Sequence, residues 1–149
     1  MAVLSWGKPL IEYATSTSGA PGTTFTGFPT PKEDTTQLTT TKGDKVEAKQ
    51  EGGAVVDAKY KASSYELVFD LFVKKGDTRP IADVDGVISG DYTIRLTPED
   101  DATEGFIIDV ATLSVEESWT AADGKILKYT ASAKKPASGA MLKPYTKTP

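Results

Sequence analysis

Apolar and polar residues alternate along much of this chain, most clearly between Thr39 and Val73. In Asp44–Gln50, valine and alanine occupy one set of alternate positions and charged residues the other. Ala54–Lys61 alternates in the same way, with Val56, Ala58 and Tyr60 in one phase. Because strand side chains point alternately to two faces, both segments are predicted to be strands with one mainly apolar and one mainly polar face. Glu51-Gly52-Gly53 between them supplies the positive φ angles of a tight hairpin turn.

The apolar face of this hairpin, Thr41–Tyr60, is thin, since it carries two alanines, a few valines and one tyrosine. An isolated two-stranded hairpin is marginally stable in water. We therefore expect the hairpin to pack on another surface, which is either its own domain or a neighbouring subunit.

Four further strands are predicted from period-two patterns. In the first of them, Tyr65, Leu67, Phe69, Leu71 and Val73 form one face, and the first four of these are expected to be the centre of the core. In the third, the alternation changes phase, which predicts a β-bulge near Val110–Ala111. The four strands are Ser64–Lys74, Val87–Thr97, Phe106–Trp119 and Lys125–Lys134.

A short helical segment is predicted at Thr78–Val84, with Thr78 as its cap and Pro80 early in the helix. No stretch shows sustained helical periodicity. The expected fold is mainly β, a sandwich or barrel of about seven or eight strands, in a single domain spanning residues 1–149.

Residues 15–41 differ from the rest in composition, since eleven of them are threonine and glycine and proline are scattered among them. This segment has too little apolar surface to fold alone. It is interpreted as a flexible loop, or alternatively as an extended arm docked by Phe25 and Phe28.

Charge and composition narrow the function further. The net charge of −4 disfavours non-specific binding to nucleic acid. Residues 99–117 contain seven acids and no base, and residues 124–149 contain six lysines and no acid. This asymmetry suits like subunits that meet through unlike surfaces, although a solvated surface explains it equally well. The chain begins without a basic, apolar leader, so we expect no signal peptide, and no membrane span is readable.

Cysteine and histidine are absent, which excludes disulfide scaffolds, thiolate zinc sites and Ser-His-Asp triads. Asp83, Asp85 and Asp91 resemble half of a calcium loop, but Val87 and Ile94 stand where further ligands are required, so turn formation is the preferred interpretation. The acidic turn at residues 99–104 is interpreted as a solvated loop, with a weak cation site as the alternative. No cofactor or catalytic residue is predicted.

Trp6 and Trp119 raise the idea of sugar stacking, but packing in the core or at a sheet edge is the preferred interpretation for both.

The layout of these elements resembles the tail tube proteins (major tail proteins) of long-tailed bacteriophages. The resemblance covers residues 39–135. It is carried by Lys42-Gly-Asp-Lys-Val-Glu-Ala-Lys-Gln-Glu-Gly-Gly53, by Tyr65-Glu-Leu-Val-Phe69 and by the closing hairpin from Trp119 through Leu127 to Ala133.

The resemblance implies a structural virion protein and not an enzyme. It implies a tail-tube β-sandwich or barrel with one short helix and a long protruding hairpin. Subunits of that family form hexameric rings, which stack into a tube that DNA traverses without sequence-specific binding, and they contact other tail proteins and no membrane. Such a chain would be made in the bacterial host cytoplasm and reside in the phage tail. The residues implied in contacts between rings are Lys45, Glu47, Lys49, Glu51, Gly52, Gly53 and Asp57.

A second interpretation remains open, a β-sandwich binding module of a surface or virion protein, immunoglobulin-like or carbohydrate-binding. Self-association distinguishes the two, because a tube protein forms rings or filaments and a sugar-binding module stays monomeric.

Overall fold

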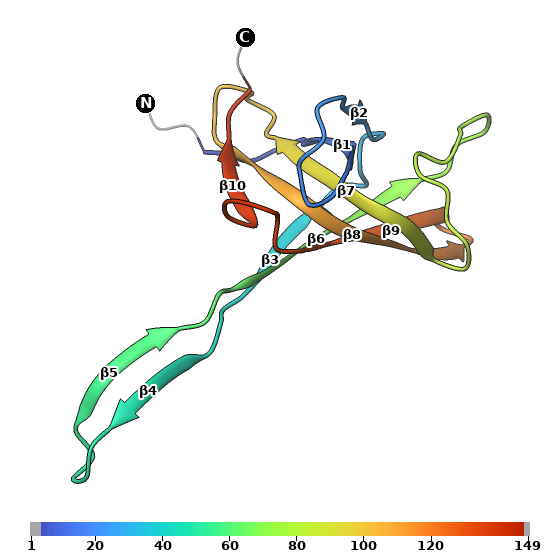
Figure 1. Cartoon of the computed structure of the whole chain (residues 1–149). Coiled ribbons are helices and arrows are strands. Elements are labelled where there is room, and N and C mark those ends of the chain that lie inside the picture. Colours follow the sequence, from blue (N-terminus) through green and yellow to red (C-terminus); the bar gives the residue numbers. More distant parts are fainter. Residues whose placement is uncertain (1–3, 148–149) are drawn as a thin grey trace.

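The computed structural model describes residues 4–147 and consists of antiparallel strands, loops and turns (Figure 1). Residues 1–3 and 148–149 lie outside the described residues. The expectations of no signal peptide and of a lysine-rich segment at residues 124–149 depend in part on them. The mainly β prediction is confirmed. The strands are β1 (Leu10–Ser16), β2 (Thr26–Gly27), β3 (Gln37–Thr41), β4 (Lys45–Lys49), β5 (Val55–Tyr60), β6 (Ser64–Phe72), β7 (Val87–Thr97), β8 (Gly105–Thr120), β9 (Gly124–Ala133) and β10 (Leu142–Tyr145).

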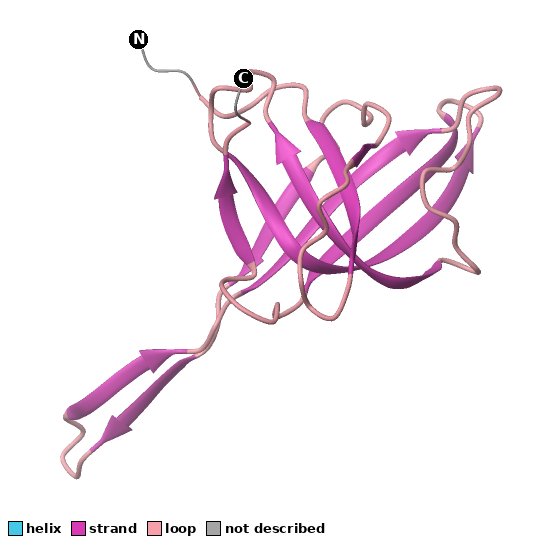
Figure 2. Cartoon of the chain, turned by 45° about the horizontal axis from the view of Figure 1, so that its top comes forward, coloured by secondary structure: helices cyan, strands magenta, loops and turns pink. Residues whose placement is uncertain are grey.

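Eight strands form one curved sheet in the order β2-β1-β7-β8-β9-β6-β3, and β10 pairs with the beginning of β8. The long strand β8 links the two halves of this sheet, since its first residues pair with β10 and its last ten with β9. Figure 2 shows the sheet curling around its interior. The arrangement is consistent with the β-sandwich class. The remaining strands, β4 and β5, form a separate two-stranded sheet.

A β-bulge allows β8 to keep apolar residues in the core as far as Val115. Tyr92 pairs with Ala111 and Ile94 pairs with Ile108, so Asp109 and Val110 oppose the single residue Thr93. The extra residue shifts the alternation by one position, which puts both Ile108 and Ala111 in the core cluster. The predicted bulge is confirmed, one residue earlier than expected.

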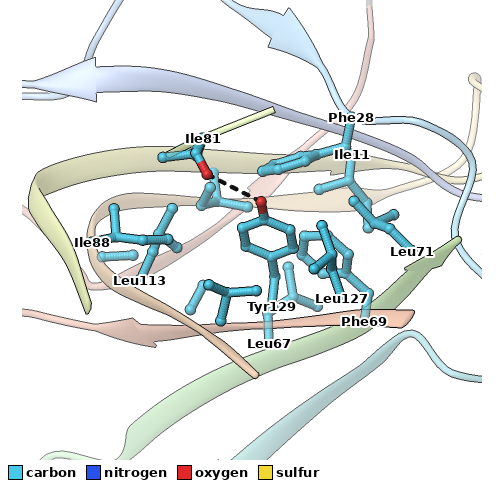
Figure 3. Packing of buried hydrophobic residues seen from close by; sticks show 14 of the residues in the cluster. Ile11, Phe28, Leu67, Phe69, Leu71, Ile81, Ile88, Leu113, Leu127 and Tyr129 are labelled. Atoms are coloured by element: carbon cyan, nitrogen blue, oxygen red, sulfur yellow. Dashed lines mark hydrogen bonds between the residues drawn. The ribbon is translucent and has the colours of Figure 1, made fainter. Parts of the chain in front are cut away.

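The core lies inside the curve and is centred on Phe69 and Tyr129, which are 1% and 0% exposed (Figure 3). Their rings stack at a centroid distance of 5.8 Å, and Phe28 packs on both. Tyr13 of β1 contacts Phe28 at 4.7 Å, so aromatic contacts join the two halves of the sheet. Leu67, Phe69 and Leu71 are buried and Tyr65 is half-buried, which confirms the face of β6 predicted as the centre of the core.

The Thr/Pro-rich segment 15–41 is docked on the domain, as in the second of its two interpretations. Phe28 belongs to the core cluster. Phe25 lies on the side of the sheet opposite the core, where its ring centroid is 3.7 Å from the Arg95 guanidinium. Arg95 also forms an ion pair with Glu12 at 2.9 Å. The amide of Lys32 donates a hydrogen bond to the carbonyl of Asp70 at 2.8 Å. Two aromatic anchors therefore compensate for the small apolar surface of the segment, which also contributes β2 and β3.

The predicted helix at Thr78–Val84 is wrong, since this segment is a loop with bends and without helical hydrogen bonds. Tertiary contacts outweigh its weak helical signals. Ile81 is 6% exposed in the core, and its carbonyl accepts a hydrogen bond from the Tyr129 hydroxyl at 3.2 Å.

Candidate assembly surfaces

The hairpin of β4 and β5, residues 45–60, is hereafter the arm, and it projects away from the curved sheet (Figures 1 and 2). Every residue from Lys45 to Tyr60 is exposed. The two strands pair with each other in a sheet of their own. Because a two-stranded sheet of this kind is marginal in water, the arm is a surface to which contact with a partner would add stability.

The faces of the arm differ from the predicted amphipathic pattern. Each strand alternates as expected, but Val46 pairs with Lys59 and Ala48 pairs with Asp57. The apolar positions of β4 therefore share a face with charged positions of β5, so neither face of the arm is apolar throughout. The pattern within one strand does not contain this information, because the relation between the two strands depends on the pairing register.

The arm continues the ladder formed by β3 and β6. Thr41 pairs with Ser64 and Lys45 pairs with Tyr60, four residues further along each strand, so the same register continues across the neck as far as Ala48, after which it shifts at a bulge. The ladder is interrupted at a neck, residues 42–44 and 61–63. A Cβ atom at Gly43 would lie 2.0 Å from the carbonyl oxygen of Lys61, so the close approach of the two chains requires glycine there.

All seven residues implied in contacts between rings lie on the arm. Glu47 bridges two lysines of its own strand, Lys45 at 2.7 Å and Lys49 at 3.7 Å. Glu51, Gly52 and Gly53 form the tip, where both glycines have positive φ, as the sequence predicted. The Asp57 carboxylate accepts the amide hydrogen of Ala58 at 2.9 Å. The arm is therefore densely charged, and some of its charged side chains already form ion pairs with one another.

The outward surface of β8, β9, β6 and β3, hereafter the polar face, carries small hydroxyl and charged side chains. Its rows follow from the strand registers, because residues paired across neighbouring strands point to the same side. The side chains along these rows are those of Gln37, Thr39, Glu66, Val68, Asp70, Thr112, Ser114, Glu116, Lys128, Thr130 and Ser132, of which only Val68 is apolar.

Both margins of the polar face have a strand edge without a backbone partner among the described residues. At one margin, β3 pairs only with β6. At the other, β7 accompanies β8 only as far as Ser114, and the amide of Val115 donates to the carbonyl of Gly86. The following residues, 116–120, pair only with β9. Each open edge is five residues long. Such edges are ready templates for pairing with another chain.

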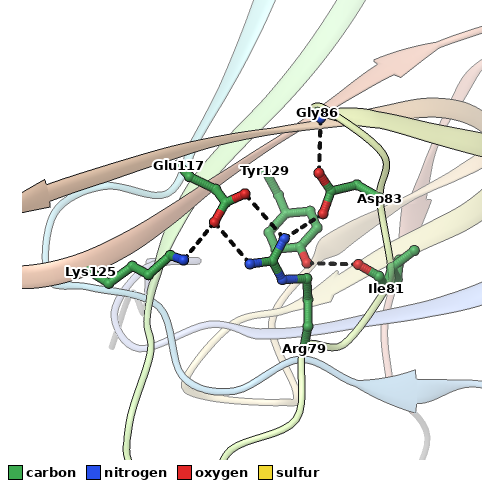
Figure 4. Close-up of polar contacts among 7 residues, drawn as sticks. All are labelled: Arg79, Ile81, Asp83, Gly86, Glu117, Lys125 and Tyr129. Atoms are coloured by element: carbon green, nitrogen blue, oxygen red, sulfur yellow. Dashed lines mark hydrogen bonds and ion pairs between the residues drawn. The ribbon is translucent and has the colours of Figure 1, made fainter.

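A charged cluster holds the loop before β7 against β8 and β9 (Figure 4). Arg79 donates to Asp83 at 2.5 Å and to Glu117 at 2.9 Å, and Lys125 pairs with Glu117 at 2.8 Å. The Asp83 carboxylate also accepts the amide hydrogen of Gly86. Hydrogen bonds from Arg79 and Lys125 lower the pKa of Glu117 to about 2, and the Arg79 and Gly86 bonds lower the pKa of Asp83. The same carboxylates raise the pKa of Arg79.

This cluster predicts a loss of stability in acid. A carboxylate with a lowered folded-state pKa stabilises the fold above its unfolded pKa, near 4.5 for Glu117, and this contribution disappears as pH falls toward 2. We expect Arg79→Met to lower the melting temperature at pH 7 and to reduce its fall between pH 5 and 2.5. Thermal unfolding at several pH values measures both, with Lys128→Met as the control. Equal acid sensitivity in Arg79→Met and the parent chain would contradict the assignment.

The acids that resemble half of a calcium loop do not converge. Asp83 faces Arg79, and Asp91 pairs with Lys134 at 3.1 Å. Asp85 and Gly86 have positive φ in a tight turn closed by Val84 and Val87, which confirms the turn interpretation. Across residues 4–147, no group of three or more acidic side chains is arranged to hold a metal ion, the acidic turn at 99–104 included.

The charge asymmetry of the sequence is partly neutralised inside the chain. Lys125 pairs with Glu117, and Lys143 of β10 pairs with Asp109 at 2.5 Å. The Asp109 side chain is 4% exposed, because the C-terminal strand covers it. These lysines and acids therefore form ion pairs within one subunit. They do not support contacts between unlike surfaces of two subunits.

The tryptophans contradict the packing preferred for them from the sequence. Trp6 is 72% and Trp119 is 70% exposed. Trp119 lies near the end of the β8 ladder, opposite Lys125, where the strand has run beyond the core. Alternation does not indicate where a strand outruns the core.

No family model matches the chain, and no curated protein matches it. Among the described residues, no helix is long and apolar enough to cross a membrane.

Proposed function

We propose that this chain is a structural protein that self-assembles into stacked rings and so forms a tube of the phage tail type. The observation that carries the proposal is the pair of open edges at opposite margins of the polar face, combined with an arm whose residues are all exposed. The polar face has four strands that alternate in direction, so β3 of one copy meets β8 of the next in antiparallel orientation. Repetition of this contact closes a ring.

The polar face then becomes the inner wall of the ring. Its hydroxyl groups and its acids, Glu66, Asp70 and Glu116, outweigh the single cation Lys128. Like charge keeps the DNA backbone from adhering to such a wall, so DNA can pass without specific binding. The arm extends beyond the ring and links it to the next one. Hexameric symmetry, other tail proteins as partners and residence in the virion belong to the same proposal.

Electron microscopy of the concentrated protein tests the proposal directly. We expect rings or tubes, and a monodisperse monomer at high concentration and low salt would contradict it.

Cysteine pairs test the edge contact itself, because the chain contains no cysteine. Thr39→Cys is combined in turn with Glu116→Cys, Ser118→Cys or Thr120→Cys, whose side chains point to the same face. We expect at least one pair to give a ladder of covalent oligomers on oxidation, since a disulfide forms only between closely apposed strands. Thr39→Cys with Ser132→Cys, which lies on the inner strand β9, is the control that should give no ladder.

Charge reversal on the arm tests stacking. We expect Glu47→Lys combined with Glu51→Lys to shorten tubes and to leave the melting temperature of the subunit unchanged, because exposed substitutions change stability by under about 0.5 kcal/mol. Tube length in micrographs is the measurement. Glu33→Lys combined with Glu104→Lys makes the same change in net charge outside the arm. Tubes of normal length from the arm variant would contradict a role in stacking.

The exposed tryptophans favour one second candidate, a carbohydrate-binding module. Trp6 borders a hollow of about 550 Å³ whose lining includes Lys8, Lys32 and Glu33, and an exposed ring beside polar groups suits a sugar. Glycan binding by a chain that remains monomeric would support this candidate over a tube. Of the two candidates, only the tube gives the arm a role.

A further inference from the structure

The open edge of β8 directs the backbone groups of two of its residues to the free side. In an antiparallel pair, successive residues of a strand direct their N–H and C=O groups alternately to its two sides. The amide of Val115 donates to the carbonyl of Gly86, on the side of β8 away from β9. Glu117 and Trp119 are in phase with Val115, so their backbone groups also point away from β9.

At the other open edge, the outward backbone groups belong to Leu38 and Thr40. The amide of Val73 donates to a carbonyl of β9, so the residues of β6 in phase with Val73 direct their backbone groups toward β9. The opposite phase includes Glu66 and therefore faces β3. Because Glu66 pairs with Thr39, Thr39 is bonded to β6 and its two neighbours face the free side.

Backbone hydrogen bonding and side-chain orientation select the same registers for a contact between the two edges. At both edges, the residues with outward backbone groups carry their side chains on the side of the sheet opposite the polar face. An antiparallel contact that pairs these residues therefore also continues the polar face from one copy to the next. A shift by one residue loses both properties. The registers that keep both place Thr39 opposite Glu116, Ser118 or Thr120.

Only one of these three registers uses both edges in full. With Thr39 opposite Ser118, the five residues of β3 oppose residues 116–120 of β8. Each of the other two registers leaves two residues of either edge outside the contact. The contact cannot lengthen in compensation, because Gly86 already occupies β8 at Val115 and the strand ends at Thr120.

The same register places Trp119 at the end of an apolar row in the next copy. Trp119 then opposes Leu38, which is half-buried and pairs with Leu67. The row continues through Ala131 to Leu113, and both are buried in the core. In the other two registers Trp119 opposes a threonine. The full-overlap register therefore gives apolar contact to a ring that is 70% exposed in the free subunit.

We infer that copies of this chain join edge to edge with Thr39 opposite Ser118, and that Trp119 anchors the contact on Leu38 of the next copy. This inference rests on the proposed function and adds the register of the contact and the residue that fixes it. The two outward-facing pairs exchange two backbone hydrogen bonds each, about four in all. The Trp119 side chain extends the apolar row of one copy into its neighbour.

Cysteine pairs measure the register. Thr39 and Ser118 would form a non-hydrogen-bonded pair, whose Cα atoms lie about 4.5 Å apart, within the range that a disulfide spans. Thr39→Cys with Ser118→Cys should therefore give a ladder of covalent oligomers on oxidation. Thr39→Cys with Glu116→Cys, or with Thr120→Cys, is the matched control. These pairs should give at most about a tenth of that yield, because diagonal neighbours lie about 7–8 Å apart.

Tryptophan fluorescence measures the anchor. Trp6→Phe leaves Trp119 as the only tryptophan. Its emission should shift to shorter wavelength as light scattering reports assembly. The control, Trp119→Phe, leaves Trp6, whose emission should stay unchanged.

Truncation of each ring in the otherwise unchanged chain is the second measurement of the anchor. Trp119→Ala should raise the concentration required for assembly at least tenfold, and Trp6→Ala, which removes an equally exposed ring, should not. The melting temperature of the dilute subunit should be the same in both variants, because neither ring is part of the core.

The outcomes separate the register from the tube itself. Tubes that form with a ladder from Glu116→Cys or Thr120→Cys, and none from Ser118→Cys, overturn the register while the tube proposal stands. Tubes in which the Trp119 emission does not shift and Trp119→Ala has no effect overturn the anchor. Absence of assembly by the parent chain under every condition overturns both proposals. A Ser118→Cys ladder together with the emission shift supports both.

Discussion

Removal of the arm should abolish stacking and leave the subunit folded. In this variant Asp44 is joined to Lys61 by a short glycine linker in place of residues 45–60. The ends are already adjacent, since the amide of Lys61 donates to the carbonyl of Asp44 at 2.8 Å. The deleted residues are all exposed, so no core contact is lost. We expect tubes to disappear at concentrations at least tenfold above those at which the parent chain assembles.

Thermal unfolding and microscopy measure the two sides of this prediction. The melting temperature should change little, because shortening an exposed loop has a small effect on the free energy of unfolding. Lateral rings should persist, since the open edges of β3 and β8 are intact. Loss of the folded subunit would show that the arm acts within its own domain, and normal tubes would show that it has no role in stacking.

Phe69→Ala should destabilise the subunit by about 3–5 kcal/mol. Phe69 is 1% exposed and contacts the rings of Phe28 and Tyr129. Its removal leaves a cavity where the docked segment 15–41, β6 and β9 meet. For a chain of this length the change corresponds to a fall in melting temperature of roughly 10 °C.

Chemical denaturation of Phe69→Ala, compared with Phe72→Ala from the same strand, measures this effect. Phe72 is 38% exposed, so its truncation should cost less than about 1 kcal/mol. Equal destabilisation by the two variants would place the structural centre elsewhere.

Local patterns predict the strands of this fold well, because alternation and turn chemistry are properties of short segments. β5, β6, β7, β8 and β9 lie close to their expected bounds, and the phase change in β8 correctly indicates a bulge. The incorrect predictions arise where contacts between residues far apart in the sequence determine the structure. Thr78–Val84 carries helix signals, yet hydrogen bonds with Tyr129 and Glu117 hold it as a loop, and both partners are far from it in the sequence.

The same distinction between local patterns and long-range contacts applies to the candidate assembly surfaces. The sequence identifies the arm, its tip glycines and its charges. It does not identify the pairing of Val46 with Lys59, because register is a relation between strands. It also misses β3 and β10 as strands, since a polar, threonine-rich run and a proline-bearing tail have weak β patterns, so the open edge at β3 emerges only from the three-dimensional arrangement. The exposure of Trp119 depends on where β8 outruns the core.

The single register that passes through the neck has a consequence for folding. The turn at Gly52-Gly53 closes a local hairpin, and such hairpins form within microseconds. Pairing that starts there and proceeds toward the neck brings β3 and β6 together in the alignment they need. A slip of one residue at the tip, if carried through Gly43, would turn Leu67, Phe69 and Leu71 away from the core. We therefore expect pairing between the bulge and the neck to favour the correct alignment of β3 with β6 during folding, although the folded subunit does not require the arm.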